Sequence, residues 1–271
     1  MPAENVKKTI DAIVDWIKNY FIENGPEAKA VIGISGGKDS TVAAALLCRA
    51  LGPERVIAVM MPDGAQSDID DSYAVCNALN IPAENRYVIN IENITDACYK
   101  CVHLSKSNFA ITTNTPPRIR MTILYMIAAQ VGGRVCNTSN KSEIFIGYST
   151  KFGDSAGDFS LFKNYTASDV ITLGCYMDEL PLDLVKKPPS DGLCGSTDEE
   201  RLGFTYEELD NYIKFNILPE YDKANRIIQM HKASVHKRCI NLNAPVNHLR
   251  YNHWQKEDDW PVEEDMHDIS F

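Results

Sequence analysis

The spacing of hydrophobic residues changes along the chain, and each spacing predicts a different element. Six apolar residues near the N-terminus recur every three or four positions, which is typical of an amphipathic helix. They are Val6, Ile10, Ile13, Val14, Ile17 and Phe21. Three short β-rich runs follow, at Ala30 to Ile34, Val56 to Met61 and Tyr87 to Ile91. Helical patterns at Ser40 to Leu51 and Ser67 to Leu79 separate these runs.

This alternation indicates βαβ units and predicts an α/β fold, a doubly wound, Rossmann-like parallel sheet with helices on both faces. Ligands in such sheets bind beyond the carboxyl ends of the strands. The pattern continues with a predicted helix at Arg120 to Val131, a short strand at Arg134 to Asn137 and a helix start at Lys141 to Ile146. Two more predicted helices cover Thr205 to Lys214 and Pro219 to Lys232.

Two long stretches between these elements, Lys151 to Lys163 and Lys186 to Gly203, are rich in Gly, Asp, Pro and Ser and lack periodicity. Long loops in a compact domain are often lids or binding loops, and we expect Lys151 to Asp158 and Lys186 to Gly203 to be mobile. The residues after Lys256 are acidic, and no internal repeat or domain boundary is visible. We therefore predict one domain over residues 1–271, with an N-terminal helix and an acidic C-terminal tail.

Composition narrows the class of protein. The 271 residues are 44% hydrophobic and 24% charged, which suits one α/β domain. Lys and Arg number 27 against 37 Asp and Glu, and the resulting net charge of −10 disfavours nucleic acid as the main partner. The sequence contains no run of about 18 apolar residues, which a membrane-spanning helix would need. The N-terminus also lacks the charged and then apolar layout of a signal peptide. We expect a cytoplasmic protein that binds neither nucleic acid nor a membrane.

The eight cysteines are scattered, with a single C-x-x-C at Cys98 and Cys101. A zinc site would need a second pair or histidines at ligand spacing, which His103 alone does not supply. We interpret most of the cysteines as small buried hydrophobic residues in a reducing compartment.

The run from Val31 to Ser40 joins an apolar strand to a glycine turn and a helix start. Gly36 and Gly37 let the backbone approach a ligand and adopt positive φ, so that successive N–H groups can converge on oxygen atoms. The first turn of the helix adds unpaired N–H donors and a partial positive charge, and Ser35 and Ser40 add hydroxyls. We expect an anion to bind here, although two glycines would also suit a purely structural corner.

The spacing of this loop matches neither GxxxxGK[ST] nor GxGxxG. It resembles the SGGxDS pyrophosphate loop of the ATP pyrophosphatase group, whose members cleave ATP between the α and β phosphates to adenylate a substrate. Asp39 favours a ligand site over a structural corner. A carboxylate beside phosphates is repulsive unless a cation lies between them, so Asp39 predicts Mg²⁺.

A second polar stretch, Asn137 to Glu143, follows a predicted strand and is expected at the same edge of the sheet. Glu143 can then complete the Mg²⁺ shell with Asp39, because a triphosphate-bound Mg²⁺ needs only one or two protein carboxylates. Taken alone, the stretch fits a capped helix start equally well.

Two further clusters carry charge. The loop Lys151 to Asp158 holds a cation and two carboxylates among glycines. The stretch Ser234 to Arg238 places three basic side chains near the end of a predicted helix, which is conspicuous in an acidic protein. A favourable interaction with the helix dipole would explain the second cluster as well as a ligand would.

Taken in order, these motifs make the chain similar to the NAD synthetases over nearly its whole length. The glycine loop alone is shared by several ATP-cleaving families, whereas the ordered set is much more specific. The set consists of Gly33 to Ser40, Met61 to Asp68, Asn114 through Arg118 to Met121, Thr138 to Glu143, Lys151 to Asp154, Lys187 to Ser190 and His236 to Arg238.

The resemblance implies three groups of site residues. Thr138, Ser190 and the whole glycine loop would bind ATP, the loop residues being Gly33, Ile34, Ser35, Gly36, Gly37, Lys38, Asp39 and Ser40. Asp39 and Glu143 would bind Mg²⁺. Deamido-NAD would be held by Arg118, Lys151, Asp158, His236 and Lys237.

The resemblance also implies the reaction and the assembly. In the family, the nicotinate carboxylate attacks the α-phosphate of ATP, pyrophosphate leaves, and ammonia displaces AMP to form the amide of NAD. Glutamine-dependent members carry an additional amidase domain, and here the synthetase motifs already fill the chain. Free ammonia is therefore the expected donor, with a separate glutaminase subunit as the alternative, and a homodimer is the expected assembly.

For amide formation we hypothesise that Asp154 is the catalytic residue, attracting ammonium and accepting a proton as nitrogen attacks. One departure from the family concerns ATP. Ala167 stands where the family commonly has a lysine that contacts ATP, and Lys163 is the candidate substitute.

Three other functions fit the glycine loop alone. A tRNA-modifying enzyme of the same group would need a broad basic surface, which the net charge of −10 disfavours. A reductase of adenylylated sulfate would need a nucleophilic cysteine at the C-terminal end, and none is placed there. A nucleotide sensor would need neither the full set of metal-binding carboxylates nor a second basic cluster.

Overall fold

The computed structural model describes residues 2–65, 69–103, 108–187 and 197–239. By its internal contacts the chain divides into two units, Met1–Arg238 and Cys239–Phe271. The fold and the site described here lie in the first unit. One domain over residues 1–271, with its acidic tail, stays a prediction.

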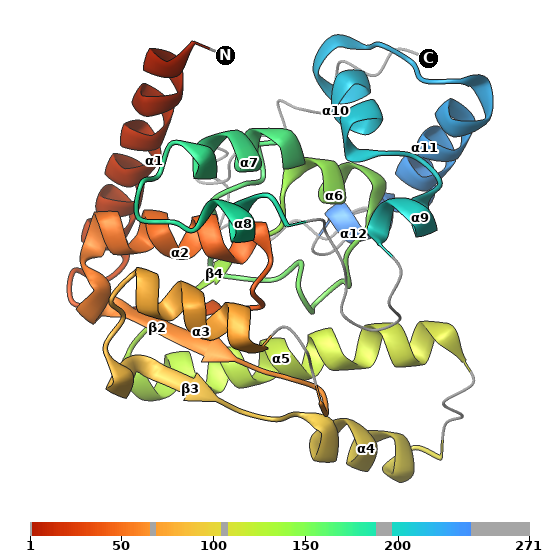
Figure 1. The fold of residues 1–271 in the computed structure, drawn as a ribbon. Coiled ribbons are helices and arrows are strands. Elements are labelled where there is room, and N and C mark those ends of the chain that lie inside the picture. Colours follow the sequence, from red (N-terminus) through yellow and green to blue (C-terminus); the bar gives the residue numbers. More distant parts are fainter. Residues whose placement is uncertain (1, 66–68, 104–107, 188–196, 240–271) are drawn as a thin grey trace, which may run out of the picture. The chain divides into compact units, whose positions relative to one another are not determined.

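Among the described residues, five parallel strands form one sheet in the order β3-β2-β1-β4-β5 (Figure 1). The strands are β1 Ala30–Gly33, β2 Val56–Met60, β3 Arg86–Val88, β4 Arg134–Asn137 and β5 Phe159–Ser160. The chain runs outward from β1 through β2 to β3, then returns to β4 on the other side of β1. This reversal beside β1 is the switch point of a doubly wound sheet, where ligands bind, and it confirms the predicted fold class.

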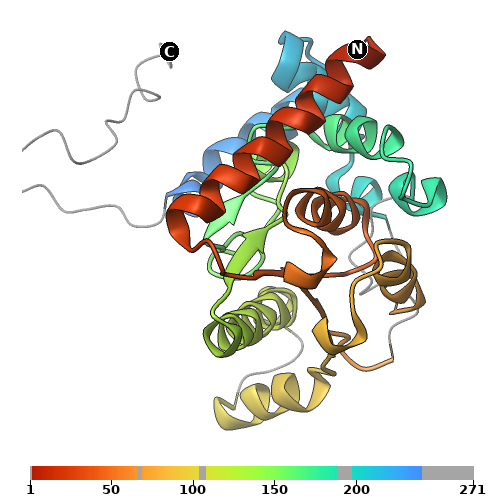
Figure 2. The ribbon, with the colours of Figure 1, turned by 90° about the vertical axis from the view of Figure 1, so that its left-hand side faces the viewer.

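Helices cover both faces of this sheet, because alternate strand residues point to opposite sides. Ala30 and Ile32 belong to one hydrophobic core, and Val31 between them belongs to another. The helices of the first face are α1 Ala3–Asn24, α2 Lys38–Leu51, α3 Ile69–Ala78, α7 Ala167–Cys175 and α8 Leu182–Val185. The second face is covered by α5 Phe109–Val131, with α4 Glu92–Cys101 packed beside it. Figure 2 shows α1 and α2 on one side of the sheet and α5 on the other.

A third, smaller core joins the helices of the C-terminal half of the first unit. Its buried members include Ile146, Leu202, Leu209 and Ile227. These helices are α6 Lys141–Ile146, α9 Asp198–Leu202, α10 Tyr206–Phe215 and α11 Tyr221–Ala233, and the short α12 Val235–Arg238 follows α11. Two 3₁₀ turns, Pro53–Arg55 and Ala83–Asn85, precede β2 and β3. Among the described residues, no helix is long and apolar enough to span a bilayer.

Most predicted elements are confirmed, and two differ from their predicted bounds by more than two residues. The third strand is Arg86–Val88 rather than Tyr87 to Ile91, although the amides of Ile89 and Ile91 still donate to the carbonyls of Met60 and Pro62. The helix predicted from Arg120 begins eleven residues earlier, at Phe109. The side chain of Asn108 caps this end by accepting the amide of Ala110 at 3.0 Å, so a polar stretch with no apolar period is nevertheless helical.

Six elements were missed by the periodicity. The helices α4, α7, α8 and α12 lie in stretches with no predicted helix, while β5 and α9 lie inside the two predicted long loops. The helices α7 and α9 each begin with a capping box, at Thr166 with Asp169 and at Thr197 with Glu200. This local signal was present in the sequence, whereas a two-residue strand such as β5 forms only because β4 lies beside it. Residues 188–196 lie outside the described residues.

Candidate active site

The glycine loop leaves the carboxyl end of β1 and leads directly into α2. Gly36 has φ = 78°, as expected, whereas Gly37 has φ = −79° and is the N-cap of the helix, so the prediction of positive φ was wrong for Gly37. The loop is held by its own serines. The hydroxyls of Ser35 and Ser40 are 3.1 Å apart, the amide of Gly37 donates to Ser35 Oγ at 3.2 Å, and Ser40 Oγ donates to the carbonyl of Gly37 at 3.0 Å.

The stretch that follows β4 forms the opposite wall. The side-chain amide of Asn137 donates to the carbonyls of Asp154 and Ala156, at 2.7 and 2.9 Å, and the amide of Ser139 donates to Asn137 Oδ1 at 3.0 Å. These bonds join the end of β4 to the loop that contains Asp154. Thr138, between these bonded residues, lines the same cavity as the glycine loop.

A cavity of about 370 Å³ lies between these walls, at the switch point of the sheet. The predicted site residues that line it come from three separate segments: Gly33, Ile34, Ser35, Gly37, Lys38, Asp39 and Ser40, then Thr138 and Glu143, and finally Asp154. Gly36 lies within the loop but does not line the cavity. The predicted phosphate, metal and catalytic residues therefore meet around one space.

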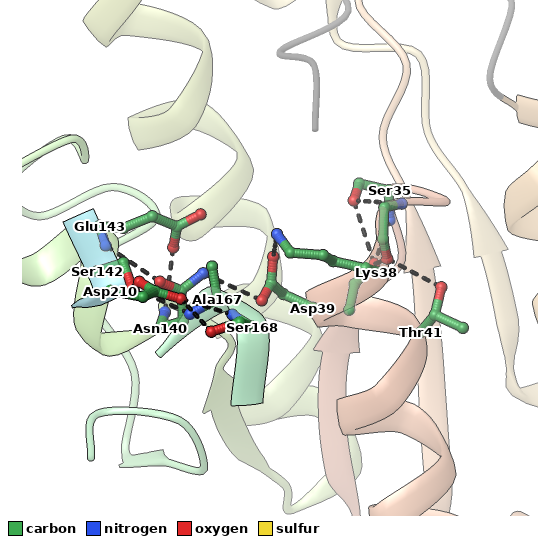
Figure 3. A network of polar contacts seen from close by, with 12 residues as sticks. Ser35, Lys38, Asp39, Thr41, Asn140, Ser142, Glu143, Ala167, Ser168 and Asp210 are labelled. Carbon is green, nitrogen blue, oxygen red and sulfur yellow. Dashed lines mark hydrogen bonds and ion pairs between the residues drawn. The ribbon is translucent and has the colours of Figure 1, made fainter. Parts of the chain in front are cut away.

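Asn140 holds the two predicted metal ligands together. Its Nδ2 donates to Asp39 Oδ1 at 3.1 Å, and its main-chain amide donates to Glu143 Oε2 at 3.1 Å (Figure 3). The second bond belongs to a capping box that starts α6, so the capped helix start and the carboxylate site are both present. Burial, and after it the nearby Asp39 carboxylate, raise the pKa of Glu143 to about 8, while Lys38 opposes the shift. We call Asp39 and Glu143 the acid pair.

Asp154 lies in the loop after α6, with its side chain open to the cavity. Its Oδ1 accepts the amide of Thr150 at 2.7 Å, and its own carbonyl is tied to Asn137. Protein atoms surround the carboxylate closely enough that loss of hydration raises its pKa, while the Thr150 amide and the Lys237 ammonium oppose the shift. The side chain is thus both held in place and accessible.

Four of the predicted dinucleotide residues lie together, and we call Arg118, Lys151, His236 and Lys237 the substrate cluster. Arg118 Nε donates to the carbonyl of Lys151 at 3.2 Å, and Lys151 Nζ donates to the carbonyl of His236 at 2.7 Å. Lys237 Nζ donates to the carbonyls of Gly147 and Ser149, at 2.8 and 2.7 Å. Desolvation lowers the pKa of Lys237, Asp154 opposes that shift, and Arg118 adds to it.

Asp158 lies apart from this cluster, just before β5. Its Oδ2 accepts the amide of Val135 at 2.7 Å, and its Oδ1 accepts the hydroxyl of Tyr125 at 3.3 Å. Ser190 lies outside the described residues. Lys163 is exposed and does not line the cavity, and Ala167 is buried in the third core with its amide donating to Ser142 Oγ at 3.0 Å.

The cavity has lining residues that were not predicted as site residues. Arg120 donates from Nε to the carbonyl of Met61 at 3.0 Å, and burial lowers its pKa. Asp198 and Lys187 also line the cavity, from α9 and from the segment after α8. Asn140, which joins the acid pair, was also not predicted as a site residue. The sequence did contain a local signal for it, because an Asn three residues before a Glu is a capping pattern. No comparable local pattern marks Arg120 or Asp198.

Comparisons with known proteins agree with this site. The family model described as NAD synthase matches residues 9–247. The NH(3)-dependent NAD(+) synthetase of Archaeoglobus fulgidus is 34% identical over 252 residues, which are 90% of this chain and 99% of that protein. Among solved structures, the NMN synthetase of Francisella tularensis has a TM-score of 0.82 at 33% identity, covering 89% of this chain and 99% of that one.

A second solved structure, the NH3-dependent NAD synthetase of Campylobacter jejuni in complex with the nitrate ion, has a TM-score of 0.71 at 26% identity. It also covers 89% of this chain and 99% of its own. The ordered motifs, the switch-point cavity and these matches lead to the same family. The chain belongs to the NAD synthase family.

Proposed function

We propose that this chain is a carbon–nitrogen ligase that amidates deamido-NAD with ammonia, using ATP and releasing AMP and pyrophosphate. The observation that carries this proposal is the convergence of the glycine loop, the acid pair and Asp154 around one cavity at the switch point. Family membership and the curated relatives, named NH(3)-dependent NAD(+) synthetases, support ammonia-dependent NAD biosynthesis.

ATP is proposed to place its phosphates over the glycine loop. The first amides of α2, from Lys38 to Ser40, have no partners within the helix and point toward this end of the cavity. Thr138 is proposed to contact the nucleotide from the opposite wall, and Ser190 belongs to the same proposal although it lies outside the described residues. Transfer of an adenylyl group needs positioning and charge neutralisation rather than a nucleophilic side chain.

The acid pair fits a hard divalent cation. Two carboxylates converge on the cavity, and the pKa of Glu143 is raised by burial first and by repulsion from Asp39 second, both of which a bound cation would offset. Asp39 and Glu143 would hold Mg²⁺, leaving phosphate oxygens and water to complete its shell. When bound, Mg²⁺ neutralises phosphate charge and so assists departure of pyrophosphate.

The substrate cluster is proposed to bind the anionic groups of deamido-NAD. Among the described residues, no carboxylate forms a salt bridge with Arg118, Lys151 or Lys237, and the hydrogen bonds that these side chains donate there go to main-chain carbonyls. Such cations keep their charge available for an anion. Asp158 remains part of the proposal, although it lies apart from the four residues of the substrate cluster.

The amide is proposed to form in a second step. The substrate carboxylate, now joined to AMP, is attacked at its carbonyl carbon by ammonia, and the C–O bond to AMP breaks. Asp154 attracts ammonium and accepts one of its protons, which gives the ammonia that attacks, and the second proton that nitrogen loses passes to water. The raised pKa of Asp154 brings it closer to neutral pH for this role.

One assay tests the whole proposal. Purified protein is incubated with ATP, Mg²⁺, deamido-NAD and ammonium, and NAD and AMP are measured. Formation of both supports the proposal, AMP without NAD identifies another acceptor, and the absence of AMP contradicts it. Glutamine in place of ammonium tests the nitrogen donor, with and without an added glutaminase.

A second candidate substrate comes from the likeness to the NMN synthetase of Francisella tularensis, at 33% identity. The acid that corresponds to NMN presents the same pyridine carboxylate as deamido-NAD but lacks the adenylate half. The site would need no different chemistry to amidate it. The ratio of kcat/KM for the two acids decides between them, because an enzyme for the mononucleotide gains nothing from the second nucleotide.

A cytoplasmic homodimer completes the proposal. The paired helices α4 and α5 carry exposed apolar side chains, which support a protein contact on this face. These are Ile94, Val102, Phe109, Tyr125 and Met126. Sedimentation velocity of the purified protein measures the assembly directly, and a monomer at micromolar concentration would contradict it.

A further inference from the structure

Lys38 is a buried cation at the start of α2. Its side chain is 3% exposed, although lysine is among the residues that are almost never buried without a partner. The partner is Asp39, whose Oδ2 lies 2.7 Å from Lys38 Nζ. Figure 3 shows the Lys38 side chain extended from the start of α2 toward the carboxylate of Asp39.

The surroundings of this ammonium group are acidic. Glu143 and Asp198 act on it electrostatically together with Asp39, and all three raise its pKa against the effect of burial. The ring of Tyr206 lies 5.5 Å from Lys38 Nζ, a cation–π distance. One lysine thus supplies positive charge to the two carboxylates that are proposed to bind metal.

Both oxygens of Asp39 already have partners within the protein. Oδ1 accepts Asn140 Nδ2 at 3.1 Å, and Oδ2 accepts Lys38 Nζ. Each oxygen keeps a further lone pair for a metal, but a divalent ion bound between Asp39 and Glu143 would lie close to the Lys38 ammonium, and repulsion between the two cations displaces the more mobile partner. Asn140 is fixed by the capping box of α6, while Lys38 is a point charge on a flexible four-carbon stem, so Lys38 is the partner that leaves.

We propose that Lys38 is the resident counter-ion of the acid pair, and that it transfers to the phosphate oxygens of ATP when a divalent ion and the nucleotide bind together. The inference rests on the proposed function for the position of the metal. Lys38 lines the same cavity as the glycine loop, so its ammonium can reach a phosphate held there without leaving the site. In that position it neutralises charge on the departing pyrophosphate.

This exchange couples the metal to the nucleotide. A divalent ion alone would leave Lys38 buried with neither carboxylate free to pair with it, which is strongly unfavourable. A nucleotide supplies the replacement partner, so each ligand strengthens binding of the other. The site therefore selects the metal–nucleotide complex over the free metal ion.

The experiment measures Mn²⁺ binding by the full-length protein, with free Mn²⁺ followed by electron paramagnetic resonance. In the wild-type protein, a non-hydrolysable ATP analogue is expected to tighten Mn²⁺ binding at least about tenfold, after subtraction of the Mn²⁺ that the same analogue binds in a protein-free control. In Lys38→Met, Mn²⁺ without nucleotide is expected to bind at least about tenfold more tightly than in the wild type, because its competitor is gone. Adding Asp39→Asn to Lys38→Met should abolish that gain.

Two lysine variants serve as controls. Lys38→Arg keeps the charge and should bind Mn²⁺ as weakly as the wild type. Lys187→Met removes another cation that lines the cavity but pairs with Asp71 at 2.5 Å, and it should also match the wild type. Thermal unfolding of each variant establishes that it is folded.

The outcomes separate this inference from the proposed function. Equal Mn²⁺ binding by the wild type with and without nucleotide overturns the inference, as does Lys38→Met binding no more tightly than the wild type. The wild-type comparison decides the matter even if a variant fails to fold. Absence of Mn²⁺ binding under every condition, nucleotide included, would instead overturn the proposed metal site.

Discussion

The two ends of the candidate site hold their charges in different ways. At the acid pair, charged groups are matched within the protein, since Lys38 pairs with Asp39 and Asn140 bonds to both carboxylates. In the substrate cluster, the cations donate their hydrogen bonds within the described part of the chain to main-chain carbonyls, as Lys151 does to His236 and Lys237 to Gly147. By our proposal, the acid pair must therefore exchange Lys38 for a divalent ion before ATP can react. The substrate cluster, in contrast, already presents positive charge that no carboxylate of the described residues neutralises.

The scaffolds of the two regions differ as well. The acid pair and the glycine loop follow β1 and β4, two neighbouring strands of the sheet. The substrate cluster joins α5, the loop after α6 and α12, which meet only through tertiary contacts. Mutations should consequently affect chemistry at the first region and recognition at the second, and the following variants test that division.

The largest effect is expected from Asp39→Asn. It removes a carboxylate from the acid pair while keeping its size, and loss of charge neutralisation on ATP should lower kcat/KM about 10³-fold or more. The measurement is NAD formation with saturating ammonium. Glu179→Gln is the control, because Glu179 pairs with Arg49 and does not line the cavity. A decrease of less than tenfold for Asp39→Asn would remove the acid pair from the mechanism.

Asp154→Asn should lower ammonia-dependent turnover about 10²-fold, because the proton acceptor is lost. Adenylation precedes the amide step, so exchange of labelled pyrophosphate into ATP in the presence of deamido-NAD should continue. This result would separate the amide step from the acid pair. Normal ammonia-dependent turnover across the pH range would rule out Asp154 as the acceptor.

Lys237→Met tests recognition. Loss of one charge-assisted contact should raise KM for deamido-NAD about tenfold and leave KM for ATP unchanged. Lys232→Met is the matched control, since Lys232 is an exposed lysine on the preceding helix α11. An equal rise of both KM values would show that the two regions do not act separately.

Glu143→Gln tests whether the folded protein holds a proton on Glu143 of the acid pair. The pKa of Glu143 is raised from 4.5 to about 8, so the folded protein keeps a proton that the unfolded chain releases between these values. The stability that this proton gives is fully present below about pH 4.5, and without metal it falls as pH rises toward 8, by less than about 1.4 kcal/mol per pH unit.

Glutamine keeps the acceptor for the Asn140 amide and does not titrate, so Glu143→Gln should flatten this dependence. Urea unfolding in the presence of a chelator, at about pH 5.5 and about pH 7.5, gives the comparison. Identical pH dependence in both proteins would mean that Glu143 is ionised throughout.

The smallest effect is expected from Lys163→Ala. Lys163 is exposed and does not line the cavity, so KM for ATP should not change. A rise of KM for ATP would instead support the substitute role suggested by Ala167. Helix α7 contains no lysine that could take the place of the family's ATP-contacting lysine. The side chain of Ala167 itself is buried in the third core.

The sequence determined the first region almost completely. The motif from Gly33 to Ser40 carries its own loop geometry, and Asn140 with Glu143 carries its own helix cap, because both depend on residues close in sequence. The βαβ order then requires that the ends of β1 and β4 meet at one edge. The sequence could therefore predict that Asp39 and Glu143 line one cavity, since each step uses local spacing and a general topological rule.

Only the tertiary structure decided how the charges are paired. Asn140 reaches Asp39 across 101 positions, and Lys237 reaches Ser149 across 88. The buried Asp210 of α10 joins Ser142 and Ser168, which anchors α6 and α7 beside the acid pair (Figure 3). Such contacts form between elements that are far apart in the sequence and that meet only when the helices pack, so no local sequence pattern encodes them. For that reason the sequence predicted which groups are present, and the fold determined which of them are neutralised and which remain free to bind.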